Sequence, residues 1–142
     1  MRARDPGPGK RVLVLAPTGR DSAAACALLE QAGVACKPCS GMDQLCRELD
    51  IGAGGAVVAE EAFFRSDPAC LFEWVNNQPP WSDFPFVILT ARRDEPRARH
   101  HTVELISKLR NVTLQERPIQ TVTLISAAHS ALRARLDRKS VV

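Results

Sequence analysis

The sequence predicts an α/β protein in which helices cover both faces of a doubly wound, five-stranded parallel sheet. Short apolar runs typical of strands alternate five times along the chain with amphipathic stretches of helical length, which is the pattern of repeated βα units. The apolar runs are continuous, as expected for strands that are buried on both faces. The 142 residues, 45% hydrophobic and 25% charged, match the size and composition of one globular domain.

Turn and capping residues place the first two strands and helices. Residues 12–15 form a Val-Leu-Val-Leu strand. The helix after it is predicted to start with an N-cap at Asp21 and to stop at Gly33, because aspartate favours the N-cap and glycine the C-terminal end. Residues 34–39 predict the second strand. Ser40 then stands at the spacing of a capping box, which predicts the start of the second helix.

The same pattern repeats three times in the rest of the chain. Residues 56–59 predict the third strand, and Asp67 before a proline predicts the N-cap of the next helix. Residues 84–90 and 112–114 predict the fourth and fifth strands, with a polar helix from Asp94 between them. The last helix carries an apolar seam at spacings of three and four residues, formed by Val122, Ile125, Ala128, Leu132 and Leu136.

The five cysteines are predicted to be small buried thiols. Their number is odd, and the sequence shows neither a signal peptide nor an apolar run long enough to span a bilayer, which predicts a cytoplasmic and reducing environment. Cys36 and Cys39 form a C-x-x-C motif, but no second pair stands at zinc-site spacing. Residues three apart on a strand also point to opposite faces. Metal or redox chemistry at this motif stays the alternative.

In folds of this kind the functional residues lie outside the carboxyl ends of the strands. There the sequence offers carboxylates at Glu60 and Glu61, a hydroxyl at Thr90 and a guanidinium at Arg117. It offers no histidine or cysteine nucleophile, no P-loop, and no dinucleotide-binding fingerprint after a strand. The sequence therefore predicts a domain that is not itself an enzyme.

The spacing of these residues resembles that of the receiver domains of two-component response regulators. The acid at the end of the third strand precedes Thr90 by 30 residues, and a basic residue before Pro118 ends the fifth strand. The resemblance covers residues 11–137, with 1–10 as a flexible leader and 138–142 as a tail or the start of a linker. It implies a flavodoxin-like sheet with the strand order 2-1-3-4-5.

Receiver domains accept a phosphoryl group on an aspartate that ends the third strand, beside Mg²⁺ held by an acidic pair after the first strand. Carried over by position, the acidic pair falls on Ala16 and Pro17 and the phosphoacceptor on Glu60, while Thr90 keeps the family's hydroxyl and Arg117 replaces its lysine. Alanine and proline side chains offer Mg²⁺ no oxygen ligand. The resemblance therefore implies a pseudo-receiver without a cofactor or metal.

Glu60 carries one more methylene than aspartate and partly mimics a phosphorylated side chain. A bidentate pair with Arg117 is predicted to hold one signalling-like state. The alternative is that Glu60 and Glu61 point into solvent and pair with nothing.

The function expected from the resemblance is regulation or interaction in bacterial two-component signalling, with a histidine kinase region, in the same chain or another, as the protein partner. The expected interaction surface, which also fits a homodimer or a coiled-coil linker, comprises Gln115, Val122, Ile125, Leu132 and Leu136.

A receiver using a non-standard acid, or a small-molecule site at the strand ends, is an alternative. Nucleic-acid binding by the arginines of residues 92–99 is another, disfavoured because the net charge is only +3 and tyrosine is absent. No membrane partner is expected.

Overall fold

The computed structural model describes residues 11–16, 19–65, 67–79, 84–90, 104, 107–116 and 121–140. Strands and helices alternate in this part of the chain, as predicted, and a short helix that the sequence did not predict, α3, follows the third strand. The elements in order are β1 (Val12–Leu15), α1 (Gly19–Gln31), β2 (Cys36–Pro38), α2 (Met42–Ile51), β3 (Gly55–Ala59), α3 (Ala62–Arg65), α4 (Ala69–Asn76), β4 (Pro85–Thr90), β5 (Asn111–Glu116) and α6 (Thr121–Ser140).

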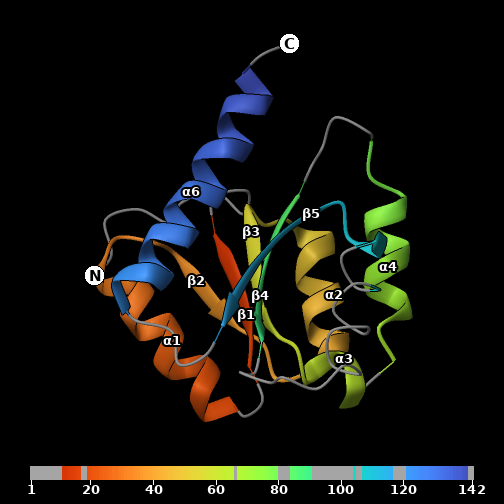
Figure 1. Ribbon diagram of the computed structural model, residues 1–142, viewed down its shortest axis with the longest axis horizontal. Helices are drawn as coiled ribbons and strands as arrows, with labels where there is room; N and C mark the ends of the chain where they lie inside the picture. The colour runs from red at the N-terminus through yellow and green to blue at the C-terminus, as the bar shows by residue number, and fades with distance from the viewer. Residues whose placement is uncertain are drawn as a thin grey trace.

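The strands form one parallel sheet in the order β2-β1-β3-β4-β5, which confirms the predicted fold class and strand order. Helices α1 and α6 cover one face, and α2, α3 and α4 cover the other (Figure 1). Because the strands are parallel, their carboxyl ends all lie on one edge of the sheet. Two adjacent rows of paired residues cross the whole sheet, and the one nearer the carboxyl ends consists of Pro38, Val14, Val57, Val87 and Thr113.

Successive strand residues pack into two separate hydrophobic cores. Leu13 and Leu15 belong to the core beneath α2 and α4, here called the α2–α4 core. Val12 and Val14 belong to the core beneath α1 and α6, the α1–α6 core. Because side chains alternate between the faces of a strand, both faces are buried only if every residue is apolar. This is the reason for the continuous apolar runs in the sequence.

The helix ends differ from their predictions in three places. Helix α1 begins at Gly19, so Asp21 lies inside it and is not its N-cap. The N-cap of α2 is Gly41, and Ser40 makes no cap of its own; instead its backbone N–H donates to the Gln44 side-chain oxygen at 2.7 Å. The N-cap of α4 is Pro68, although the predicted Asp67 carboxylate still accepts the N–H of the first helical residue at 3.0 Å. Of the three predicted caps, the carboxylate of Asp67 is therefore the one that accepts an N–H group at a helix start.

Gly33 ends α1 as predicted. Its φ of 85° lies in the left-handed region that favours glycine. The N–H groups of Gly33 and Val34 donate to the carbonyls of Glu30 and Leu29. The chain then enters β2, which is shorter than the predicted strand of residues 34–39.

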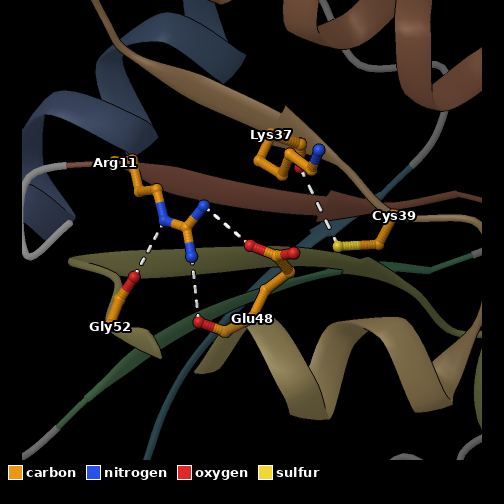
Figure 2. Close-up of polar contacts among 5 residues, drawn as sticks. All are labelled: Arg11, Lys37, Cys39, Glu48 and Gly52. Atoms are coloured by element: carbon orange, nitrogen blue, oxygen red, sulfur yellow. Dashed lines mark hydrogen bonds and ion pairs between the residues drawn. The ribbon is translucent and has the colours of Figure 1, made fainter. Parts of the chain in front are cut away.

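Two arginines that directly precede strands hold the C-terminal ends of two helices. Arg11, before β1, donates to the carbonyls of Gly52 and Glu48 at the end of α2, and its third nitrogen lies 2.8 Å from the Glu48 carboxylate (Figure 2). Arg110, before β5, donates to the carbonyl of Asn76, the last residue of α4, and to those of Gln78 and Pro79 just after the helix. The amino ends of these strands are thereby joined to the helices beside them.

The prediction that all five cysteines are free thiols is wrong in this structure. Disulfides join Cys26 to Cys36 and Cys46 to Cys70, and Cys39 is the free cysteine among the described residues. The number of cysteines, their spacing and the expected environment do not reveal these pairs, because it is the fold that brings cysteines of different elements within reach. The predicted opposite orientation of the C-x-x-C motif is confirmed, since Cys36 packs on the α1–α6 core and Cys39 in the α2–α4 core.

Helix α6 packs its first half on the sheet and runs past the sheet with its second half (Figure 1). Leu124 and Ala128 are buried in the α1–α6 core, while Ile125 and Leu132 pack at its margin. The predicted seam contained Ala128, Ile125 and Leu132 but missed Leu124. The side chains of Val122 and Leu136 lie outside the described residues. Within the described part of the chain, no helix is long and apolar enough to cross a membrane.

The polar helix predicted from Asp94 falls mostly outside the described residues. Residues 104, 107 and 108 are helical, and Leu109 is buried in the α2–α4 core. The basic residues 92–99 also lie outside the described part of the chain.

Candidate functional site at the carboxyl edge of the sheet

The sheet brings the predicted positions of β1, β3 and β4 to one edge. Ala59 pairs with Leu89, so Glu60 follows β3 beside Thr90, which ends β4. Thr90 in turn pairs with Glu116 at the end of β5. Pro17 and Arg117, the other two predicted site residues, lie outside the described residues.

Glu60 is held by its backbone and buried by its surroundings. Its N–H donates to the Leu89 carbonyl at 2.9 Å, and its carbonyl accepts the N–H of Phe63 at 3.1 Å at the start of α3. Only 2% of the residue is exposed. The alternative in which Glu60 points into solvent is therefore wrong, and a carboxylate buried to this degree needs compensating polar contacts.

Thr90 links the site to β5. The residue is half-buried, and its hydroxyl donates to the backbone carbonyl of Gln115 at 3.5 Å, a long hydrogen bond. Gln115, expected to belong to the interaction surface, is half-buried as well. The structure thus connects the end of β4 to the strand that borders that surface.

Ala16 directly follows β1, at the position where the resemblance to receiver domains implies the first acidic residue. Its N–H donates to the hydroxyl of Ser22 at 2.9 Å, and Ser22, on the first turns of α1, has no exposed surface. The backbone after β1 is therefore bound to α1 at this corner. Sequence reasoning did not find Ser22, because a small polar residue inside an amphipathic helix has no periodic signal of its own.

The residues at this edge do not fit Mg²⁺. The ion takes hard oxygen ligands in near-octahedral geometry, in proteins chiefly carboxylates. Of the two positions after β1, one carries a methyl group and the other a pyrrolidine ring, so neither offers an oxygen ligand; the carboxylates at this edge are on other strands, Glu60 and Glu61 after β3 and Glu116 at the end of β5. Among the described residues, no group of three or more His, Cys, Asp or Glu side chains is placed to hold a metal.

Two surface hollows lie outside this corner. One, of about 380 Å³, runs between β5 and α6 and is lined by small and polar side chains that include Thr113, Gln115 and Ser126. The other, of about 510 Å³, lies at the first turn of α2 and includes Arg47 and Asp67. Neither includes Glu60 or Thr90.

Comparison with solved structures finds the same fold in signalling proteins. The signal receiver domain of a signal transduction histidine kinase from Syntrophus aciditrophicus has a TM-score of 0.71 and 17% identity, over 88% of this chain and 91% of that chain. A sensor protein from Polaromonas sp. JS666 has a TM-score of 0.67 and 20% identity, over 88% of this chain and 97% of that chain.

A response regulator receiver domain protein from Clostridium thermocellum has a TM-score of 0.69 and 16% identity, over 89% of this chain and 96% of that chain. No protein-family model and no curated protein matches the sequence. At these identities the likeness establishes the fold, which is that of receiver domains.

Proposed function

We propose that this chain, with its receiver fold, is a regulatory module of two-component signalling that accepts no phosphoryl group and acts by contact with another protein. Similar folds occur in a receiver domain of a histidine kinase, a sensor protein and a response regulator receiver domain. The observation that carries the proposal is Ala16, whose methyl group stands where a metal-binding carboxylate is expected and whose N–H is bound to Ser22.

Phosphoryl transfer requires positioning and neutralisation of the charge that develops on the transferred group, and a divalent metal ion supplies much of both. This site lacks carboxylates at the two positions after β1. The nearest candidate acceptor, Glu60, is 2% exposed, which leaves little of it accessible to a phosphoryl donor. Both features oppose the alternative of a receiver that uses a non-standard acid.

Burial of Glu60 supports a constitutive state in place of a switch. A buried carboxylate is stabilised by polar or charged contacts, and in the sequence Arg117 directly follows Glu116, which ends β5 and pairs with Thr90. We assign Arg117 as the partner that holds Glu60 in a state resembling a phosphorylated receiver.

The contact surface is assigned to the side of the molecule formed by β5 and α6. Leu114 of β5 is 41% exposed, and Ile125 and Leu132 of α6 are partly buried. Helix α6 continues past the sheet (Figure 1), which suits a coiled-coil linker or a homodimer. The partner is a protein in the cytoplasm, either a kinase region or a second copy of this chain.

Amide NMR with Mg²⁺ and beryllofluoride, a phosphoryl mimic, tests the loss of phosphorylation. In the wild-type protein the amides of residues around Glu60 and Thr90 are expected not to shift. The matched variant carries Ala16→Asp, Pro17→Asp and Glu60→Asp, which restore the expected carboxylates, and its amides are expected to shift when both reagents are present. Mg²⁺-dependent shifts in the wild-type protein would contradict the proposal, whether or not the variant folds.

A further inference from the structure

Four cysteines lie in two pairs on opposite faces of the sheet. Cys26 of α1 is joined to Cys36 of β2, with Cα atoms 5.4 Å apart, beside the α1–α6 core. Cys46 of α2 is joined to Cys70 of α4, with Cα atoms 6.4 Å apart, beside the α2–α4 core. Both separations lie in the range that a disulfide spans. The first pair joins consecutive elements, with its cysteines 10 residues apart, and the second joins α2 to α4, with its cysteines 24 residues apart.

We propose that Cys46 and Cys70 form a reversible oxidation site that exchanges with low-molecular-weight thiols and disulfides of the glutathione class. Whether such a pair is open or closed depends on the thiol–disulfide poise of its surroundings. This inference goes beyond the proposed signalling role and does not depend on the absence of phosphorylation.

Accessibility distinguishes this pair from the other one. Exchange requires a thiolate to reach a sulfur atom of the disulfide. Cys46 and Cys70 are both half-buried, whereas in the other pair Cys36 is half-buried and Cys26 is only 4% exposed, so both sulfur-bearing residues are partly accessible only in the Cys46–Cys70 pair. The neighbouring Arg47 and Asp67 line the hollow of about 510 Å³ at the first turn of α2, so the protein surface is indented beside the pair. An external thiol is expected to reach this pair first.

The oxidation step conserves atoms and electrons. The thiolate of one cysteine attacks a sulfur of glutathione disulfide, forms a mixed disulfide and releases one glutathione thiolate. The thiolate of the second cysteine then attacks the protein sulfur of that mixed disulfide and releases the second glutathione. The two protein thiols are oxidised, glutathione disulfide is reduced to two thiols, and the two protons lost by the cysteines end on the two glutathione sulfurs.

Cys39 does not interfere with this exchange. It is 1% exposed, and burial, followed by the charge of Glu48, raises its pKa from 9.0 to about 11. At neutral pH the sulfur therefore stays a thiol, which is a poor nucleophile.

Closing the pair holds the start of α4 on α2. Cys70 is the second residue of α4. The segment between Glu60 and Cys70 contains the short helix α3. When the pair is open, Leu71 and Val75 still anchor α4 in the α2–α4 core. The structural effect of reduction is therefore expected at the first turn of α4 and the segment that leads into it.

The test is a glutathione redox titration of the full chain with rapid alkylation and peptide mass spectrometry. The fraction of linked Cys46–Cys70 peptide is expected to follow the ratio of oxidised to reduced glutathione. On addition of reduced glutathione to the oxidised protein, this pair is expected to open roughly tenfold faster than Cys26–Cys36. Equal opening rates, or separate alkylation of Cys46 and Cys70 at every ratio, would overturn the proposal.

Two variants sharpen the test. Cys39→Ser removes a thiol outside both pairs and is expected to leave the titration unchanged. Hydrogen exchange at the first turn of α4 is expected to be several-fold faster in the reduced wild-type protein than in the oxidised one. The double variant Cys46→Ser, Cys70→Ser is expected to show no such difference. Equal exchange in the two wild-type forms would refute the role of the pair in holding α4, and this comparison does not require the variant to fold.

Discussion

At the scale of single residues, Arg11 shows how one side chain joins two layers. It contacts two helix-terminal carbonyls and one carboxylate, and it is 19% exposed (Figure 2). Arg110 makes the same kind of contact to the end of α4, but its side chain is exposed to solvent. Hydrogen bonds from charged groups stabilise more when water competes less for them. The two arginines therefore form a matched pair that differs in burial.

Arg11→Ala is expected to lower the free energy of unfolding by about 2 kcal/mol, because three charge-assisted contacts are lost in a partly buried place. Arg110→Ala, the matched control, is expected to lower it by less than about 1 kcal/mol, because its bonds are solvated. Urea denaturation of both variants measures the difference. Equal losses in the two variants would show that burial does not determine how much these contacts contribute to the free energy of unfolding.

Glu60→Gln tests the constitutive state assigned to the carboxyl edge. The amide keeps the shape and loses the charge, so the free energy of unfolding is expected to fall by about 1–2 kcal/mol at neutral pH. The control is Glu61→Gln at the adjacent, less buried position. If Glu60→Gln changes neither stability, nor self-association, nor partner binding, the assigned pairing with Arg117 is refuted.

Cys39 gives the stability a defined pH dependence. Its pKa is raised in the folded protein from 9.0 to about 11 by burial, so the folded state holds this proton more tightly than the unfolded state. The stabilisation is complete below pH 9 and is lost as the pH rises through 11. Cys39→Ala is expected to remove about 2 kcal/mol of this decline, as measured by chemical denaturation across the window. If the free energy of unfolding falls equally with pH in the wild-type protein and in Cys39→Ala, other titrating groups cause the decline.

At the scale of elements, α6 combines two roles along its length. Its first half contributes Leu124 and Ala128 to the α1–α6 core. Its second half runs past the sheet (Figure 1), where four-residue spacing continues the apolar seam from Leu132 to Leu136. A helix of 20 residues is about 30 Å long, more than the sheet needs to be covered. This second half is the part of α6 that we propose contacts a partner.

Leu136→Gln is expected to weaken self-association at least tenfold and to leave the midpoint of thermal unfolding within about 2 °C of the wild type, because the apolar seam in the second half of α6 is proposed to contact the partner. Arg135→Gln, the adjacent residue away from the seam, is the control and is expected to behave as the wild type. Sedimentation velocity over a concentration series measures both. A monomeric wild-type chain at all concentrations would refute the homodimer, and a kinase region would then be the partner to test.

At the scale of the whole molecule, the two cores share the three central strands of one sheet, β1, β3 and β4. Neighbouring residues of β1, β3 and β4 contribute to opposite cores, so neither core is complete without the strands that build the other. Cooperative two-state unfolding is expected for a single domain built in this way. The aromatic contacts of Trp74 and Phe84, with ring centroids 5.0 Å apart in the α2–α4 core, provide a local probe of one side.

In a Trp81→Phe background, Trp74 fluorescence reports on the α2–α4 core and far-ultraviolet circular dichroism on the whole backbone. The two denaturation curves are expected to coincide, because the sheet couples the cores. The same measurement on the reduced protein checks that the result does not rest on the disulfides. A fluorescence transition well before the dichroism transition would show that the α2–α4 side unfolds independently.

The sequence alone determined the positions of the five strands along the chain, the parallel sheet and the absence of carboxylates after the first strand. These features follow from local chemistry, because a strand buried on both faces needs a continuous apolar run and a metal site needs oxygen ligands in particular positions. Only the tertiary structure decided the burial of Glu60, the bond from Ala16 to Ser22 and the pairing of Cys46 with Cys70. These three features depend on the distances in space between different elements of the chain. Neither the periodicity nor the spacing of residues in the sequence encodes those distances.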